Sequence, residues 1–216
     1  MSERREPAGR RKKVQLTVKW LVDRTVAAAG LVALAPLFAV VAVAIKLDSP
    51  GPVFFRQERV GKDGRPFRVW KFRTMLPESA RPEAGYFVDK EDPGITKTGR
   101  VLRRWSLDEL PQLLNVLAGQ MSLVGPRPTL AYQVQQYNDF QRQRLLMRPG
   151  LTGHAQVTGR NALPWTKRIE LDVEYIRNWS LLLDLKLLFK TPLAVLSKEG
   201  IYAEGGVSDF KPPGQD

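Results

Sequence analysis

Two adjacent carboxylates, Asp108 and Glu109, follow two arginines in residues 103–111, which read RRWSLDELP. Carboxylates in such a setting can act as a nucleophile, as a general base or as ligands of a hard cation such as Mg²⁺. Ser106 and Glu109 have the spacing of a capping box, which predicts a helix from this point to Leu117. Asp108 would then lie near the positive end of the helix and stay ionised. Acidic residues are also common at helix starts, so the pattern alone leaves a purely structural role open.

Basic residues suited to phosphate surround this pair in the sequence. Arg100 and Arg103 precede it, Arg127 stands between two prolines, and Lys71 and Arg73 end a β-rich segment. The arginine side chain presents a planar fork to phosphate oxygens, and the flanking prolines restrict the backbone at position 127. These five residues are the candidate phosphate ligands, although each cation alone is more often a solvated charge.

Several other chemistries are absent from the sequence. The chain has no cysteine, which excludes disulfides and thiolate chemistry. Neither a GxGxxG nor a GxxxxGK[ST] motif is present, so we expect no Rossmann or P-loop nucleotide site. His154 is the only histidine, so we expect neither a His-ligated metal cluster nor a Ser-His triad, and we expect His154 to be structural or on the surface. Asp172 and Glu174 have a metal-like spacing, but on an amphipathic helix we expect a solvated face.

A long apolar segment is the first element that must position these residues. Residues 25–45 carry no charge and contain Pro36 near the middle. As a helix they would be about 30 Å long, enough to cross a bilayer. Both flanks are equally basic, since residues 1–24 and 46–73 each carry eight Lys or Arg and three acidic residues. A re-entrant segment that turns back at Pro36 would keep both basic flanks on the cytoplasmic side of the membrane. A kinked transmembrane span would place one of these flanks on the opposite side. A cleaved signal peptide and a buried core helix remain alternatives.

The net charge of +12 is concentrated beside this segment. Residues 1–73 carry +10 of it. This distribution fits attraction to an anionic membrane leaflet, so we expect a lipid bilayer as a partner. We do not expect nucleic acid as a partner, because the basic residues cluster around an apolar segment and not along a DNA-reading motif.

The remaining pattern predicts an α+β, mainly helical protein. Residues 53–60 and 67–72, joined by a turn at 61–64, predict a β-hairpin. Residues 78–94 predict a loop and residues 132–147 a surface helix. Residues 181–196 have apolar residues at helical spacing but are interrupted by charges and Pro192, so they fit an interfacial amphipathic helix and a core helix equally well. The predicted organisation is a disordered basic arm (1–15), a membrane segment (16–48), a catalytic domain (49–205) and a tail (206–216).

Taken together, these residues resemble the monotopic phosphoglycosyl transferases of the bacterial sugar transferase family, over roughly residues 17–205. Besides the apolar segment with Pro36, the resemblance is carried by DSPGPVFFRQ (48–57), KFRTM (71–75), SLDELPQL (106–113), LVGPRP (123–128), RPGLTG (148–153) and NWS (178–180). The occurrence of all these strings in this order is specific to that family.

The resemblance implies a re-entrant helix-break-helix in the cytoplasmic leaflet of the bacterial inner membrane, with a cytosolic active site. It implies Asp108 as the nucleophile that attacks the β-phosphate of a UDP-sugar and releases UMP. Polyprenol (undecaprenyl) phosphate then takes the sugar phosphate, which is the first membrane step of bacterial glycan assembly, as in exopolysaccharide or lipopolysaccharide biosynthesis. The resemblance further implies Glu109 as general base for the lipid phosphate or as a residue that orients it, Mg²⁺ held partly by Asp108, and Arg103 and Arg127 on phosphate oxygens.

Two positions depart from the family pattern, and one alternative function remains. Ala35 stands where many members have a serine that helps to satisfy carbonyls at the bend, so another interaction must stabilise it. His154 stands where members often have an aromatic residue. The alternative function is a membrane-surface scaffold without catalysis, and the intact Asp108 and Glu109 count against it.

Overall fold

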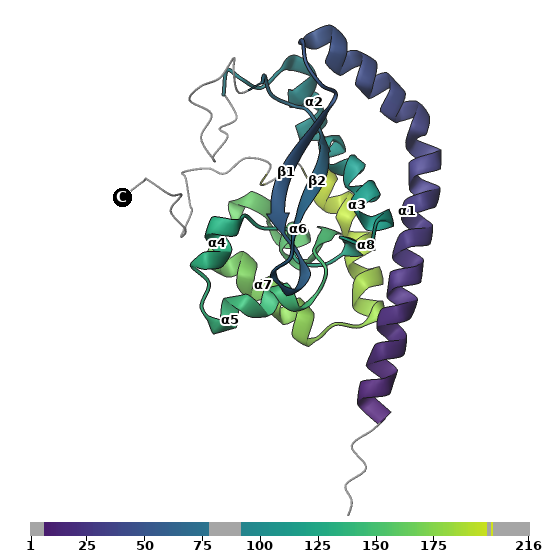
Figure 1. Cartoon of the computed structure of the whole chain (residues 1–216), viewed down its shortest axis with the longest axis vertical. Helices are drawn as coiled ribbons and strands as arrows, with labels where there is room; N and C mark the ends of the chain where they lie inside the picture. Colours follow the sequence, from purple (N-terminus) through teal and green to yellow (C-terminus); the bar gives the residue numbers. More distant parts are fainter. Residues whose placement is uncertain (1–6, 78–91, 198–199, 201–216) are drawn as a thin grey trace, which may run out of the picture.

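The computed structural model describes residues 7–77, 92–197 and 200, and describes side chains from Lys12 onward. Within these residues the protein is mostly helical, with two small sheets and one long apolar helix at the N-terminus. Figure 1 shows this helix, α1, running along one side of a body formed by all other elements, with its upper part inclined over that body. The predicted tail and most of the loop predicted at 78–94 lie outside the described residues.

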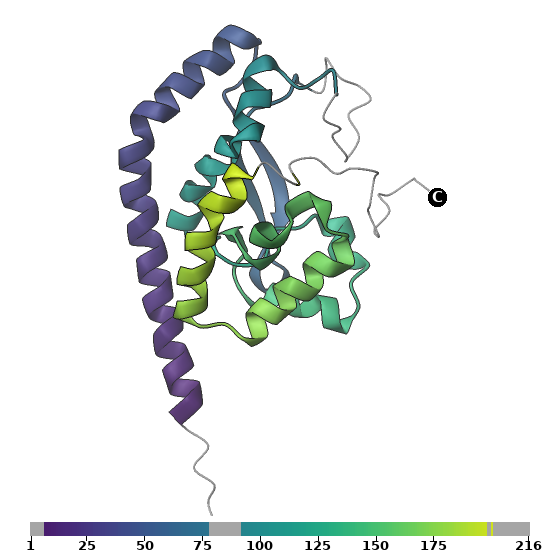
Figure 2. The ribbon, with the colours of Figure 1, turned by 180° about the vertical axis from the view of Figure 1, so that it is seen from behind.

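Helix α1 spans Pro7–Asp48 and includes Pro36. It begins nine positions before residue 16, so the prediction of a disordered arm is wrong for residues 7–15, while residues 1–6 lie outside the described part of the chain. The predicted break is a bend within one continuous helix, and the view from behind shows the same inclination (Figure 2). Residues Lys12–Asp48 are long and apolar enough to cross a membrane, and only 11% of their most apolar window is buried.

The predicted β-hairpin is confirmed. Strands β1 (Phe54–Val60) and β2 (Pro66–Phe72) pair antiparallel, with Phe54 opposite Phe72, and the turn contains the short 3₁₀ helix η1 (Lys62–Gly64). The outer edge of β2 is covered by Asn115, whose side chain accepts from Trp70 N at 2.9 Å and donates to Arg68 O at 2.8 Å. This side chain satisfies backbone groups that an edge strand would leave unpaired.

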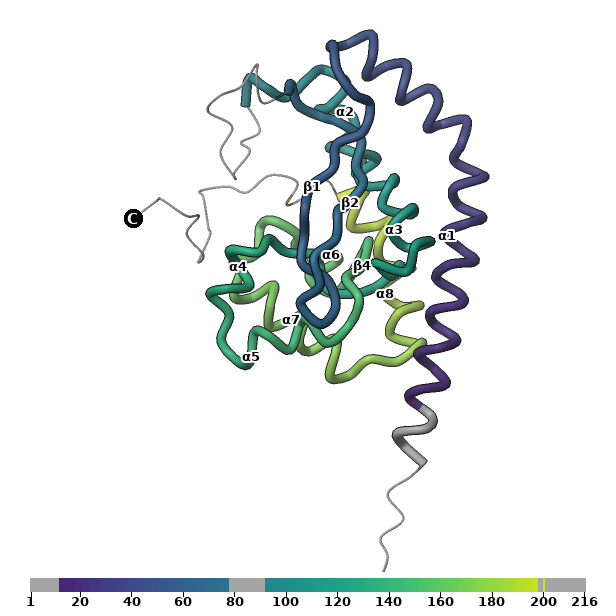
Figure 3. The backbone as a smooth tube through the Cα atoms, viewed as in Figure 1, coloured from purple at the N-terminus to yellow at the C-terminus, as the bar shows by residue number. Residues whose placement is uncertain are grey.

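The second sheet joins two short segments that are far apart in sequence. Strands β3 (Ser122–Val124) and β4 (Gly150–Thr152) pair in parallel, and Figure 3 shows the backbone passing through β4 near α8. Gly125 and Gly150 are required here, because a Cβ at either residue would overlap the backbone of the other. This contact fixes the start of the loop that carries Arg127.

The remaining helices are short, except for two near the C-terminus. They are α2 (Lys97–Arg104), η3 (Leu107–Gln112), α3 (Leu113–Leu117), α4 (Ala131–Gln135), α5 (Asp139–Arg142), η4 (Gln143–Leu146), α6 (His154–Thr158), η5 (Arg160–Ala162), α7 (Trp165–Arg177) and α8 (Leu181–Leu196). The single surface helix predicted at 132–147 is wrong. Asn138 caps a new helix by accepting from Gln141 N, and Arg144 is buried, so the segment folds as three short turns.

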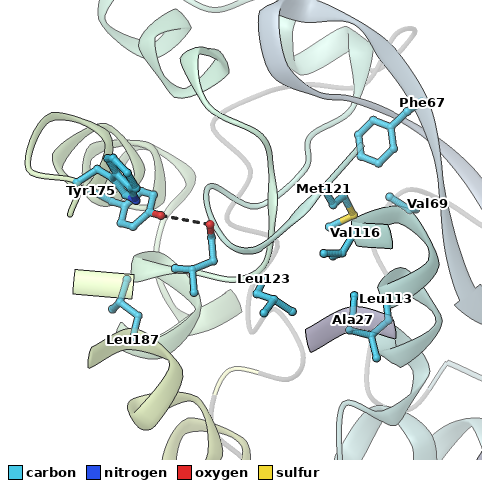
Figure 4. Close-up of a cluster of buried hydrophobic side chains, with 11 residues drawn as sticks. Ala27, Phe67, Val69, Leu113, Val116, Met121, Leu123, Tyr175 and Leu187 are labelled. Carbon is cyan, nitrogen blue, oxygen red and sulfur yellow. Dashed lines mark hydrogen bonds between the residues drawn. The ribbon is translucent and has the colours of Figure 1, made fainter. Parts of the chain in front are cut away.

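The main core lies where α1 meets β2, α3 and α8. Ala27 of α1 packs in one cluster with Val69, Leu113 and Leu187, as Figure 4 shows. Tyr175 of α7 borders this cluster and donates its hydroxyl to Val124 O at 3.2 Å. A second cluster joins the C-terminal part of α1, through Val41 and Ile45, to Phe72 and Leu102. Both ends of the apolar segment therefore pack on the body.

A buried polar network also fastens α1. Lys19 donates to Asp184 at 2.7 Å, and Asp184 also accepts from Tyr175 and Trp179. Asp23, one turn after Lys19, accepts from the Ser122 hydroxyl. Asp184 belongs to α8, so the inner face of that helix is buried while Leu182, Phe189 and Leu193 on it are exposed. The sequence fitted α8 equally well to a core helix and to an interfacial amphipathic helix. The structure shows features of both, because one face of α8 lies in the core and an apolar face lies outside it.

Candidate active site

A cavity of about 800 Å³ contains the two predicted carboxylates. Its walls come from β1, β2, η3, the loop after β3, and helices α6, α7 and α8. Asp108, Glu109, Arg103, Arg127 and Lys71 all line it. The fold therefore gathers these five residues from four separate stretches of sequence.

The chain around the acidic pair differs from the predicted capped helix. Ser106 has a left-handed backbone (φ 55°), its side chain caps nothing, and the segment continues as the 3₁₀ helix η3 before α3 begins at Leu113. The capping-box prediction is therefore wrong. The Glu109 side chain points to two cations, which offer it stronger charge-assisted bonds than a backbone N–H does.

Glu109 is held by Lys71 and Arg127. Its Oε1 accepts from Lys71 Nζ at 2.7 Å and from Arg127 Nη2 at 2.8 Å, and its Oε2 accepts from Arg127 Nη1 at 3.3 Å. Burial alone would raise the pKa of Glu109, but the charges of Arg127 and Lys71 outweigh burial and hold this pKa well below its usual range. Glu109 is thus an ionised carboxylate that orients two cations.

Asp108 has the opposite environment. Burial raises the pKa of Asp108 to about 6, the charge of Lys71 opposes this rise, and the charge of Glu109 adds to it. In the described part of the chain no hydrogen bond or ion pair reaches the Asp108 side chain. The ionisation of Asp108 is therefore governed by burial and neighbouring charges and not, as the sequence predicts, by the end of a helix. Adjacent carboxylates with divergent pKa values are a frequent arrangement of catalytic acids, bases and nucleophiles.

Arg103 reaches the cavity from the last turn of α2. Its Nε donates to Thr74 Oγ1 at 2.9 Å. Thr74 is the second residue after β2, and α2 approaches it so closely that a Cβ at Gly99 would overlap the Thr74 carbonyl. The contact of Gly99 with Thr74 therefore sets the position of Arg103.

Two predicted phosphate ligands do not line the cavity. Arg73 is buried and donates to the carbonyls of Ser49 (2.8 Å) and Pro50, so it fastens the exit of α1 to the end of β2. Arg100 is exposed on α2. Neither is among the residues that line the cavity around the acidic pair.

Arg59 and Arg160 are among the four cavity arginines that the sequence did not predict, together with Arg144 and Arg168. Among the described residues, Arg59 and Arg160 have no carboxylate partner. Burial lowers the pKa of Arg59 to about 10, with Arg127 adding to the effect, and burial also lowers the pKa of Arg160. The alternation of β1 could have identified Arg59, because it follows Phe55 and Gln57 at two-residue intervals and all three line the cavity.

The prediction of a solvated face at Asp172 is also wrong. Asp172 and Arg144 form an ion pair with side chains 1% exposed, and Arg144 Nη2 donates to Arg127 O at 3.1 Å. The pair therefore supports the backbone of Arg127. Glu174 is exposed as predicted, and His154 is half-buried at the start of α6, outside the residues that line the cavity.

The donor set fits a metal ion only in part. No group of three or more potential ligand side chains from His, Asp and Glu occurs in residues 7–77, 92–197 and 200. Glu109 is engaged by cations, so Asp108 is the carboxylate of the pair that is available to a metal. Mg²⁺ commonly binds through one or two carboxylates plus substrate phosphates, and Asp108 fits that mode.

The fold and the site together define a class of protein. A carboxylate without a direct partner among the described residues lies in a cavity lined by several arginines, in a protein that also has a long apolar helix. This arrangement suits group transfer from a phosphate-bearing substrate.

Comparisons with known proteins agree with that class. The Bacterial sugar transferase family matches residues 14–198. The "Uncharacterized sugar transferase EpsL" of Bacillus subtilis is 51% identical over 76% of this chain and 79% of its own length. The "Exopolysaccharide production protein ExoY" of Sinorhizobium fredii is 40% identical, over 83% and 86%. The "UDP-glucose:undecaprenyl-phosphate glucose-1-phosphate transferase" of Caulobacter vibrioides is 43% identical, over 91% and 76%. The chain belongs to the bacterial sugar transferase family.

Proposed function

We propose that this enzyme transfers a sugar-1-phosphate from a UDP-sugar to undecaprenyl phosphate and releases UMP. The observation that carries the proposal is the unpaired Asp108 carboxylate beside the Lys71–Glu109–Arg127 cluster. The relatives named as UDP-glucose:undecaprenyl-phosphate transferases support UDP-glucose as the first donor to test.

In the first step Asp108 acts as the nucleophile. One carboxylate oxygen attacks the β-phosphorus of the UDP-sugar, the bond from that phosphorus to the bridging oxygen breaks, and UMP leaves with that oxygen. The product is an acyl phosphate that joins Asp108 to the sugar phosphate. Arg103 and Arg127 bind phosphate oxygens, and Arg59 and Arg160, which have no carboxylate partner among the described residues, add positive charge around the transferring group.

In the second step undecaprenyl phosphate attacks the same phosphorus. The bond between that phosphorus and the Asp108 oxygen breaks, which restores the carboxylate and yields the lipid diphosphate sugar. Glu109 keeps Lys71 and Arg127 directed toward the phosphate groups, and its lowered pKa favours this orienting role over that of a general base for the lipid phosphate. Asp108 would also contribute to holding Mg²⁺, which supplies charge neutralisation for the diphosphate when bound.

Release of UMP tests the reaction. Protein reconstituted in lipid with Mg²⁺ and undecaprenyl phosphate should release UMP from at least one member of a UDP-sugar panel. Asp108→Asn should abolish release, and Arg100→Gln, on an exposed residue outside the cavity, should retain it. Undiminished release by Asp108→Asn would refute the nucleophilic role.

We further propose that α1 is re-entrant at the cytosolic face of the bacterial inner membrane, so that the cavity lies where the lipid phosphate does. The proposal rests on the basic residues at both ends of the apolar segment, on Pro36 within it, and on its small buried share. Because the chain lacks cysteine, single cysteines at Lys12 and Lys62 can be labelled in intact cells with an impermeant maleimide. Neither should react before permeabilisation. Reaction at one site alone would establish a span instead.

A further inference from the structure

A second cavity, of about 140 Å³, lies beside the N-terminal half of α1. It shares no lining residue with the active-site cavity. Its walls come from α1, the hairpin turn, α3, β3, and the end of η4 with the following residues. None of the steps proposed above uses it.

The charges around this second cavity do not balance. Lys19 and Asp23 contact each other at 3.4 Å, and each also has a partner elsewhere in the body, at Asp184 and Ser122 respectively. Arg24 and Arg148 also line the cavity, and among the described residues neither has a carboxylate partner. Arg24 lies over the Trp20 ring, 4.6 Å from its centroid, and Arg148 donates only its Nε to Gly119 O at 2.9 Å. Two guanidinium groups therefore remain available to an anion.

The other walls are mostly apolar and also include Lys62, which pairs with Asp63 at 3.8 Å. Leu16 and Trp20 of α1 line the cavity together with Leu146 and Met147, and Leu16 and Leu146 are exposed. Arg24 is the last charged residue before the uncharged stretch 25–45. The cavity thus lies where α1 changes from charged to apolar, and tryptophan is a residue type enriched at that level of a membrane.

We propose that this cavity binds the phosphate group of an anionic phospholipid, with the acyl chains leaving along the apolar surface of α1. The volume suits a phosphate-sized group and not a whole lipid. Arginine pairs bind phosphate through several donors at once, and basic pockets beside membrane helices are suited to acidic head groups. The same chemistry would also accept free phosphate, so the test must separate the two sources.

Fluorescence of Trp20 reports on this cavity directly. The Trp20 contribution is the difference between the protein and its Trp20→Phe variant, both reconstituted in vesicles. Brominated phosphatidylglycerol should quench it at a mole fraction on the order of tenfold lower than brominated phosphatidylcholine does. Arg24→Gln/Arg148→Gln should remove this preference. The control variant Arg104→Gln/Arg142→Gln removes the same amount of charge from exposed arginines outside the cavity. It should keep the preference for phosphatidylglycerol.

Each other outcome overturns the proposal. Equal quenching by the two lipids, or a preference that survives in Arg24→Gln/Arg148→Gln, would show that no such site exists. Loss of the preference in millimolar inorganic phosphate at constant ionic strength would assign the cavity to free phosphate. These results do not depend on UMP release, so the proposed reaction can fail or succeed separately.

Discussion

At the scale of the residue, Asp108 and Glu109 are neighbours in sequence with opposite protonation behaviour. Glu109 is surrounded by Lys71 and Arg127, and its pKa lies below its usual range, whereas burial raises the pKa of Asp108 to about 6. An unpaired carboxylate is the better nucleophile, because no ion pair must break before it attacks. The division of roles between the two residues follows from this difference.

The pKa of Asp108 predicts the pH dependence of the first step. The reactive form is the carboxylate, so single-turnover UMP release without lipid acceptor should fall as pH decreases through about 6. It should be about tenfold slower at pH 5 than at pH 7. The lipid acceptor is omitted because its phosphate group also titrates, and this titration would add a second pH dependence to the measured rate. If the rate of UMP release fell only near pH 4, this acid limb of the pH profile would contradict the raised pKa of Asp108.

Glu109→Gln tests the electrostatic coupling of the pair. The charge of Glu109 contributes to the raised pKa of Asp108, and its removal also leaves Lys71 and Arg127 without their partner. The acid limb of single-turnover UMP release should therefore move to lower pH. Glu58→Gln, on an exposed residue of β1, is the matched control and should not move it. An unchanged limb in Glu109→Gln would mean that the two carboxylates are not coupled.

At the scale of the element, close backbone contacts position the cations. Helix α2 packs on Thr74, the second residue after β2, only because Gly99 has no side chain, and this contact brings Arg103 to Thr74. Arg73 fastens the exit of α1 to the same strand end, two residues after Lys71. The end of the long apolar helix and the candidate active site thus share one support.

Gly99→Ala should separate α2 from β2. The added methyl group overlaps the Thr74 carbonyl, so the backbone must shift, at a cost of about 2 kcal/mol in the free energy of unfolding. We expect a lower Tm and slower UMP release, because Arg103 moves with α2. Arg100→Ala, at the next and exposed position, should leave the Tm almost unchanged. A Gly99→Ala protein with normal Tm and activity would show that this contact is not restrictive.

At the scale of the whole molecule, a buried ion pair joins α1 to the body. Because the apolar residues of α1 are not confined to one face, hydrophobic packing alone specifies its rotation weakly. The side chains of Lys19 and Asp184 are 8% and 9% exposed and contact each other at 2.7 Å. Removing one partner leaves the other charged and buried. We infer that this ion pair fixes the rotation of α1 about its own axis relative to the body.

Asp184→Asn and Lys19→Met should each lower the free energy of unfolding by about 3 kcal/mol, and the double variant by less than the sum. Chemical denaturation in detergent micelles measures all three. The exposed Lys167–Glu170 pair provides the control, and Lys167→Met should cost less than about 0.5 kcal/mol. Additive effects of Lys19 and Asp184 would contradict a direct coupling.

The sequence by itself determined the features that depend on neighbouring residues. Alternation of side chains and turn residues predicted the hairpin, and the uncharged run predicted the long apolar helix. The strings around Asp108 and Arg127 indicated the family, which the comparisons confirmed.

Only the tertiary structure decided features that depend on distant partners. Glu109 meets Lys71 and Arg127 instead of capping a helix, Arg73 binds carbonyls at the exit of α1, and Asp172 is buried with Arg144. Local pattern could not predict these roles, because a charged side chain binds whichever partner the fold brings within 3 Å or so. The pKa of Asp108 depends on tertiary structure for the same reason, since desolvation by the surrounding elements, and not position at a helix end, sets it.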